Sequence, residues 1–149
     1  MIKKVLFLAM FATALFSNSF NQNSNIGSFE LTDQFDKKHT VNSDVKTMIV
    51  SFEKGTSADL NDFLATKEKG FLEANNAVFI ADISGMPSII TKIFALPKMK
   101  KYNYNILLIT DDEDKRFLQQ EEKLTVYKLN NGIVTSVQYI TKEDIPSLF

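Results

Sequence analysis

Three polar residues stand where a strand is expected to lead into a helix. Lys54, Thr56 and Ser57 come shortly after the apolar run Met48–Val50. Free N–H groups at a helix N-terminus bind anions or peptide carbonyls, which makes this loop a candidate binding site. The alternative is ordinary helix capping by Thr56 or Ser57.

A second candidate site follows the apolar run Ala77–Ala81. Asp82 and Ser84 come at the end of that run, and in open α/β sheets ligands bind at the carboxyl ends of strands. The alternative is local: either side chain can cap a turn made by Gly85.

A basic and aromatic stretch is the third candidate, and it would bind a partner. Its members are Lys98, Met99, Lys100, Lys101, Tyr102 and Tyr104. Exposed aromatic side chains mixed with charge are typical of interaction surfaces, and this one suits an acidic partner or lipid headgroups. The alternative is a solvated loop.

Several chemistries are excluded by residue type. The chain has no cysteine and a single histidine, His39, so it has no thiol chemistry and lacks the ligands of the usual zinc sites. The acidic run Asp111–Asp114 does not have the alternate spacing of an EF-hand loop, and no dinucleotide-binding G-x-G-x-x-G occurs. We expect His39 on a surface hairpin, and no catalytic residue, metal site or cofactor.

The elements that would position these residues begin with two runs that are apolar on both faces, Ala77–Ala81 and Ile106–Ile109. Such runs predict central strands covered above and below. Between them, Gly85-Met86-Pro87 predicts the start of a helix and Leu96-Pro97 its end. Helical spacing places four residues of this helix on one apolar stripe, Ile89, Ile90, Ile93 and Phe94.

The rest of the chain supplies two hairpins, a further strand and two helical segments. An edge strand over 28–35 is expected to turn back through 39–41, and 48–52 predicts another central strand. Helical spacing over 60–72 is interrupted near Gly70. Strands at 124–129 and 133–140 are joined by Asn130-Asn131-Gly132, a type I′ turn signal, and a capping box at Thr141 predicts a short terminal helix. This order indicates a three-layer α/β domain with a mixed central sheet and helices on both faces.

The first residues carry a targeting signal. Lys3 and Lys4 precede a short apolar run, which predicts a signal peptide over 1–19, cleavage before Phe20 and a periplasmic protein; the alternative is a membrane anchor. Residues 20–27 are polar and are expected to be disordered, with the domain at 28–149. The net charge of −1 argues against nucleic acid.

The element order, together with Phe29-Glu30-Leu31-Thr32-Asp33-Gln34 (F-x-L-x-D-Q), resembles the thioredoxin-like superfamily and its peroxiredoxin-like branch over residues 29–148. The chain is also similar to small exported bacterial proteins that share runs like FIADISGMP and KIFALPKMKKY. Some of those carry the label "FAD/FMN-containing dehydrogenase".

Two marks of thioredoxin-like enzymes are missing here. The stretch that corresponds to their redox cysteines, Phe52–Ala58, has none. Their cis-proline is matched to Asn105, where we expect a trans peptide and count the residue as a candidate for binding. The resemblance thus implies a redox-inactive domain of the cell envelope that binds protein or peptide, without stable membrane insertion. The alternatives are a non-thiol enzyme with a flavin or metal near Asp82 and Ser84, and a structural or assembly factor.

Overall fold

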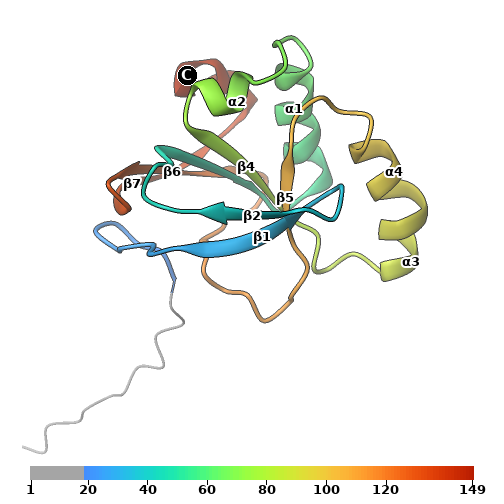
Figure 1. Cartoon of the computed structure of the whole chain (residues 1–149), viewed down its shortest axis with the longest axis horizontal. Coiled ribbons are helices and arrows are strands. Elements are labelled where there is room, and N and C mark those ends of the chain that lie inside the picture. The colour runs from blue at the N-terminus through green and yellow to red at the C-terminus, as the bar shows by residue number, and fades with distance from the viewer. Residues whose placement is uncertain (1–18) are drawn as a thin grey trace, which may run out of the picture.

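The structure is a computed structural model that describes residues 19–149. Its centre is a seven-stranded mixed sheet in the order β2-β1-β5-β4-β3-β6-β7 (Figure 1). The strands are β1 (Phe29–Asp33), β2 (Lys38–Val41), β3 (Thr47–Ser51), β4 (Ala77–Asp82), β5 (Ile106–Ile109), β6 (Leu124–Asn130) and β7 (Ile133–Ile140). The signal peptide predicted from the sequence falls outside the described residues, apart from Ser19.

The central strands are those that the apolar runs predict. Strands β3, β4 and β5 are parallel, and every residue of β3 and β5 is buried. Strand β6 runs antiparallel to β3 and pairs with β7. Asn131 and Gly132, with φ of 49° and 79°, make the turn between β6 and β7, as the Asn-Gly signal predicts. The α/β class and the mixed sheet are therefore confirmed.

Helices cover one face of the sheet. The cluster on that face joins Leu60 and Leu64 of α1 (Lys54–Leu64) and Leu72 of α2 (Phe71–Ala74) to Phe79 of β4. Gly70, with φ of +88°, lies between α1 and α2, so the predicted interruption is confirmed. The last element, η2 (Lys142–Leu148), is a 3₁₀-helix packed on α1.

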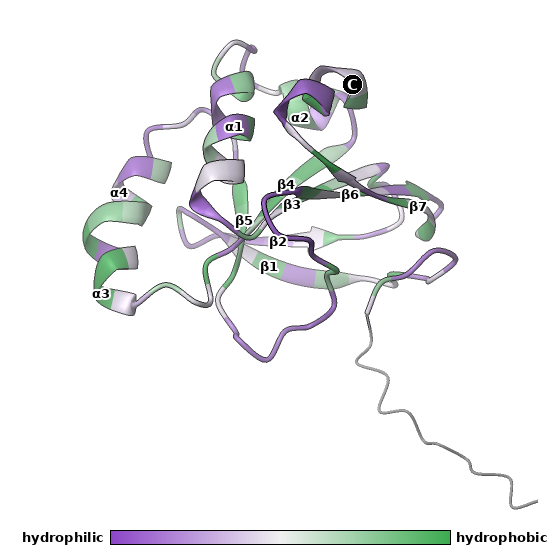
Figure 2. Cartoon of the chain, turned by 180° about the vertical axis from the view of Figure 1, so that it is seen from behind, coloured by the Kyte–Doolittle hydropathy of each residue, from purple (hydrophilic) through white to green (hydrophobic). Residues whose placement is uncertain are grey.

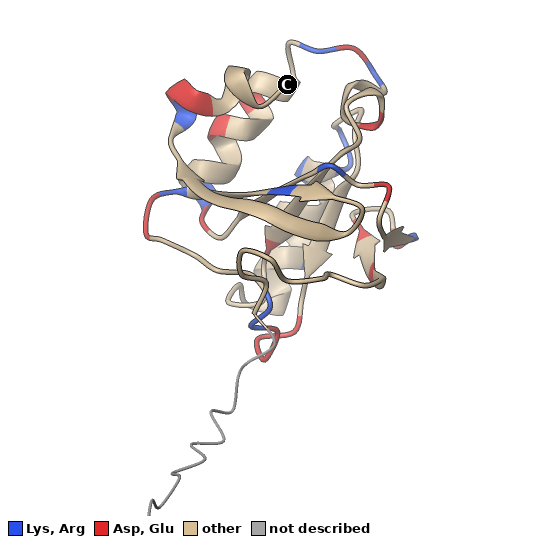
Figure 3. Cartoon of the chain, turned by 90° about the vertical axis from the view of Figure 1, so that its left-hand side faces the viewer, with Lys and Arg blue, Asp and Glu red and all other residues tan. Residues whose placement is uncertain are grey.

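The other face is covered by irregular chain, where the sequence predicts helices. Its cluster joins Met48, Ile80 and Tyr127 of the sheet to Phe20 and Phe117. Within residues 19–149 no helix contributes to that cluster, because aromatic side chains from two loops fill the same space. Charges of both signs are spread over the loops on the side shown in Figure 3, as expected for a nearly neutral chain.

The prediction of a disordered segment over 20–27 is wrong. The Phe20 N–H donates to the Arg116 carbonyl at 2.7 Å, the Ile26 N–H donates to the Gly132 carbonyl at 2.9 Å, and both side chains are buried. The ring of Phe20 meets Phe117 edge-on at 5.4 Å. The segment is polar overall, but its two large apolar residues, Phe20 and Ile26, are buried and hold it on the sheet.

The predicted edge strand is an inner strand. Strand β1 lies between β2 and β5, and β2 forms the edge. Burial alternates along β1, where Leu31 and Asp33 are buried and Glu30 is exposed, and the following Gln34 is buried as well. Asp33 and Gln34 are accommodated by hydrogen bonds, which the apolar pattern does not show.

The helix after β4 continues past its predicted end. It comprises α3 (Ser88–Ile90), a π-helical turn η1 (Thr91–Ala95) and α4 (Leu96–Met99), here together called the 88–99 helix. In the π turn the Leu96 N–H donates to the Thr91 carbonyl. Pro97 then falls in the first turn of α4, where its missing N–H disrupts no bond. The turn therefore lets the helix pass Pro97.

The apolar stripe of the 88–99 helix faces solvent. Ile89 is 63% exposed, Ile93 56% and Phe94 65%, with Ile90 at 41%. Figures 1 and 2 show this helix standing at the side of the domain, with strongly hydrophobic segments along it. The sequence pattern correctly predicts a stripe, but within the domain nothing covers it.

Candidate functional site

Five of the predicted site residues come to one edge of the sheet. Lys54, Thr56 and Ser57 follow β3, while Asp82 and Ser84 follow the adjacent parallel strand β4. Asn105 precedes β5 and therefore lies at the opposite edge, beside a small cavity of about 130 Å³ that His39 also lines. Its peptide bond is trans, as is every other bond in the described part of the chain.

The two hydroxyls near the start of α1 are held by local bonds. Helix α1 begins at Lys54, with Glu53 as the residue before it and no side-chain cap. The Thr56 hydroxyl donates to the Glu53 carbonyl at 3.2 Å, and the Ser57 and Ser51 hydroxyls are 2.6 Å apart. Neither Thr56 nor Ser57 caps the helix in the way that the sequence suggests, because the helix begins earlier, at Lys54.

Asp82 and Ser84 form a closed turn at the end of β4. One carboxylate oxygen of Asp82 accepts the Ser84 N–H at 2.9 Å and the Ser84 hydroxyl at 2.6 Å. The pair thus takes the local arrangement that the sequence leaves open as an alternative.

A segment that the sequence analysis missed lies against the start of α1. Strand β6 is antiparallel to β3, so its amino end meets the carboxyl end of β3. There the Glu122 N–H donates to a carboxylate oxygen of Glu53 at 2.8 Å. The stretch facing the start of α1 is therefore the loop before β6, whereas Asn105 lies at the opposite edge of the sheet. Only the antiparallel pairing of β6, a long-range feature, reveals it.

The predicted partner patch divides into two parts. Tyr104 is 8% exposed, and its hydroxyl donates to Asn61 of α1 at 2.6 Å. Burial raises the pKa of Tyr104, and the ring of Tyr102 stacks on it at 5.2 Å. These aromatic side chains therefore pack inward, while Lys98, Lys100 and Lys101 remain exposed.

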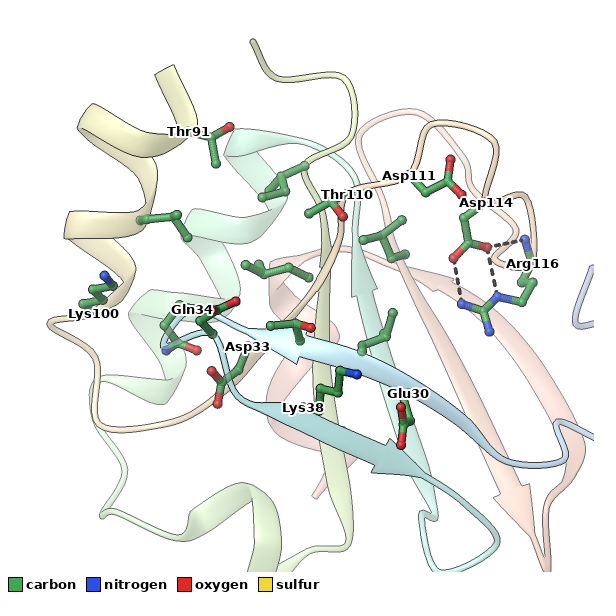
Figure 4. Close-up of a pocket in the computed structure, with 17 residues that line it drawn as sticks. Glu30, Asp33, Gln34, Lys38, Thr91, Lys100, Thr110, Asp111, Asp114 and Arg116 are labelled. Atoms are coloured by element: carbon green, nitrogen blue, oxygen red, sulfur yellow. Dashed lines mark hydrogen bonds and ion pairs between the residues drawn. The ribbon is translucent and has the colours of Figure 1, made fainter. Parts of the chain in front are cut away.

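A second hollow, larger than the cavity beside Asn105, is a crevice of about 620 Å³ (Figure 4). Strand β1 forms one side, the end of β5 the floor, and the 88–99 helix and the loop 110–116 the ends. Strands β1 and β5 pair only at Thr32–Leu108 and Asp33–Leu107, although β1 pairs with β2 as far as Phe29. The crevice therefore opens where β1 diverges from β5.

Hydrogen bonds fix the closed end of the crevice. Asp33 accepts the N–H groups of Phe35 at 2.8 Å and Lys37 at 3.1 Å, and pairs with His39. Burial alone would raise the pKa of Asp33, but these bonds outweigh it and hold that pKa below its ordinary value. The Gln34 side chain donates to the Tyr104 carbonyl and accepts the Ile106 N–H, both at 2.8 Å.

An ion pair stands at the open end. Arg116 donates to both carboxylate oxygens of Asp114, at 3.0 and 2.8 Å, and lies 4.5 Å from the centre of the Phe29 ring. Burial opposes ionisation of Asp114, yet the bonds from Arg116 lower its pKa overall. Both ends of the crevice are therefore preorganised, and residues far apart in sequence build it.

Comparison with solved structures identifies the fold. The thioredoxin domain of a thiol-disulfide oxidoreductase from Bacteroides vulgatus is similar over 87% of this chain and 96% of its own, with a TM-score of 0.56 and 13% identity. A peroxidoxin from Mycobacterium tuberculosis is similar over 87% and 93%, with a TM-score of 0.54 and 13% identity. The chain has a thioredoxin-like fold.

Sequence comparison adds nothing to this. No family model matches the chain, and no curated protein is significantly similar to it. The C-terminal domain of an uncharacterized protein from Bacteroides fragilis also shares the fold, with a TM-score of 0.54, 11% identity, and coverage of 89% and 97%. At these identities the likeness establishes the thioredoxin-like fold alone.

This thioredoxin-like domain has no cysteine and is therefore not a thiol redox enzyme. Among the described residues, no group of acidic and histidine side chains is arranged to hold a metal ion. No helix in that part of the chain is long and apolar enough to cross a membrane.

Proposed function

We propose that this redox-inactive thioredoxin-like domain works by binding an extended protein or peptide segment in the crevice beside β1. The observation that carries the proposal is the divergence of β1 from β5 after the Thr32 and Asp33 pairs. An extended chain adds to a strand edge through main-chain hydrogen bonds. Here the part of β1 that does not pair with β5, Phe29–Leu31, provides such an edge along the crevice.

The lining of the crevice suits a peptide backbone better than a purely apolar ligand. Glu30, Lys38 and Thr110 are exposed polar residues along it, and Leu31 and Leu108 provide apolar contact below. Because Asp33, Asp114 and Arg116 are already hydrogen-bonded, they shape the site at little further cost of ordering.

The proposal also covers the cellular location of the protein and its branch within the thioredoxin-like superfamily. Lys3, Lys4 and the apolar run after them support export to the periplasm. Cleavage at or before Ser19 would keep Phe20, with its bond to Arg116, in the mature chain. The leading F-x-L-x-D-Q phrase and the β1–β2 hairpin support the peroxiredoxin-like branch, in keeping with the likeness to the mycobacterial peroxidoxin.

The test is a peptide library selected on the folded domain, followed by amide chemical-shift mapping of the selected peptides. We expect shifts at Leu31, Thr32 and Ile109, and loss of binding in Thr110→Trp, which fills the crevice. Thr135→Trp, on the exposed side of β7, is the matched control and should bind normally. Peptides that bind Thr110→Trp equally well and perturb other strands would refute the crevice as the site.

A further inference from the structure

The 88–99 helix has an inner side that is anchored and an outer side that is not. Leu96 and Met99, together with Met86 just before the helix, pack against the core that α1 covers, and Gln34 donates to the Met99 carbonyl at 3.3 Å. Ile89, Ile90, Ile93 and Phe94 point away and account for four of the six exposed large apolar residues in the described chain. Such clustering marks an interaction surface.

The charge around this stripe has one sign. From Ile83 to Thr110 the chain has no aspartate or glutamate and four lysines, Lys92, Lys98, Lys100 and Lys101. All four are exposed. Because the whole chain carries −1, this connection holds +4 and the remainder −5. The exposed apolar stripe is thus set in the one strongly cationic region of an otherwise acidic chain.

We propose that the 88–99 helix docks on the headgroup surface of an anionic phospholipid bilayer. Interfacial helices combine large apolar side chains with lysines beside them, and they lie in the membrane plane without spanning it. The lysines gain from the negative surface potential, and Ile93 and Phe94 gain from burial at the acyl boundary. This accounts for both the uncovered stripe and the missing acidic residues.

Charge also argues against a second copy as the occupant. In a two-fold symmetric dimer the same patch meets itself, so the four lysines of one chain would face the four lysines of the other. Repulsion of like charges disfavours that arrangement. A lipid surface of opposite sign is complementary to the patch.

The experiment is flotation of the chain from Ser19 onward, which contains both core clusters and all seven strands, with vesicles of phosphatidylglycerol and phosphatidylcholine. Vesicles of phosphatidylcholine alone are the lipid control. We expect binding to the anionic vesicles, weakened by salt. Lys92→Glu/Lys98→Glu should weaken partitioning by at least about 25-fold, since each lysine contributes about fivefold. Lys69→Glu/Lys142→Glu is the charge-matched control and should bind nearly as the wild type does.

The apolar contribution is tested separately. Ile93→Ser/Phe94→Ser should lower partitioning about tenfold or more, while Phe35→Ser/Ile133→Ser, which removes exposed apolar residues elsewhere, should not. Absence of binding to anionic vesicles overturns the proposal. So does a concentration-dependent dimer that Ile93→Ser/Phe94→Ser dissociates, or binding that only an acidic protein supports. Failure of the crevice to bind peptide leaves this result untouched, because the substituted residues Lys92, Lys98, Ile93 and Phe94 do not line the crevice, although Lys100 does.

Discussion

The two connections between the parallel strands both have apolar residues at helical spacing, but the domain buries these residues in the first connection and leaves them exposed in the second. Residues 54–74 link β3 to β4, and residues 83–105 link β4 to β5; each presents large apolar residues at helical spacing. In the first connection Leu60 is fully buried and Leu64 is 2% exposed. In the second, Ile93 and Phe94 are more than half exposed. Periodicity thus defines a face, and tertiary structure decides whether the domain itself covers it.

The difference lies in what packs against each connection. The first connection is closed by aromatic packing, in which Phe63 and Phe71 surround the C-terminal Phe149. The second meets the core through residues outside the stripe, namely Ile83, Met86, Leu96, Met99, Tyr102 and Tyr104. Within residues 19–149, its apolar side chains Ile89, Ile90, Ile93 and Phe94 remain exposed.

The largest expected effect is on stability, from truncation in the two helices. Leu60→Ala should lower the free energy of unfolding by about 2–5 kcal/mol, because it leaves a cavity in a closed core. Ile93→Ala, of similar chemistry, should change it by less than about 0.5 kcal/mol. Urea denaturation of both variants measures the free energy of unfolding. Equal losses in the two variants would contradict the contrast between the buried and the exposed helix.

The second prediction concerns the hydrogen bonds by which Gln34, after β1, holds the connection between β4 and β5. Gln34→Leu should cost about 2 kcal/mol, because it leaves the buried Ile106 N–H and the Tyr104 carbonyl without their partner. Hydrogen exchange should also speed up near Met99. The exposed Gln119→Leu is the control, and a silent Gln34→Leu would show that the tie is dispensable.

Acid should weaken the domain through Asp33, which belongs to neither connection. Its folded pKa lies below its ordinary value, so its stabilising contribution is complete above the unfolded pKa of about 3.9 and is lost as pH falls through the folded pKa. Asp33→Asn should cost about 1.5 kcal/mol at neutral pH and raise the pH midpoint of acid unfolding. The exposed Asp36→Asn is the control; an unchanged midpoint in Asp33→Asn would contradict the assignment.

The smallest effect belongs to the loop where a thioredoxin enzyme carries its cysteines. Ser57→Ala removes one hydrogen bond, to Ser51, and should cost about 1 kcal/mol or less. Peroxide and disulfide turnover should be at the uncatalysed rate in wild type and variant alike, since no thiolate is present. Measurable turnover by the wild type would overturn the redox-inactive assignment.

The sequence predicts the parts of the fold that rest on local or continuous patterns. The runs at β3, β4 and β5, the Asn131-Gly132 turn and the interruption at Gly70 are of this kind. The burial of Phe20 could not be predicted, because it depends on Phe117 and Tyr127 about 100 residues away.

The candidate site was less predictable for the same reason. The crevice depends on where β1 leaves β5, which is a matter of long-range register. Thr56, Ser57, Asp82 and Ser84 lie at one edge of the sheet, and their hydroxyls and the Asp82 carboxylate are engaged in local bonds. Local patterns located the edge but not the hollow beside it.

The most direct test of the account is amide hydrogen exchange of the two connections, with and without anionic vesicles. The account predicts that residues 88–99 exchange faster than α1 in the domain alone, and that vesicles slow exchange in 88–101 while α1 is unchanged. Equal protection of both helices in the domain alone, together with no response of 88–101 to vesicles, would contradict the claim that the second connection is a docking surface.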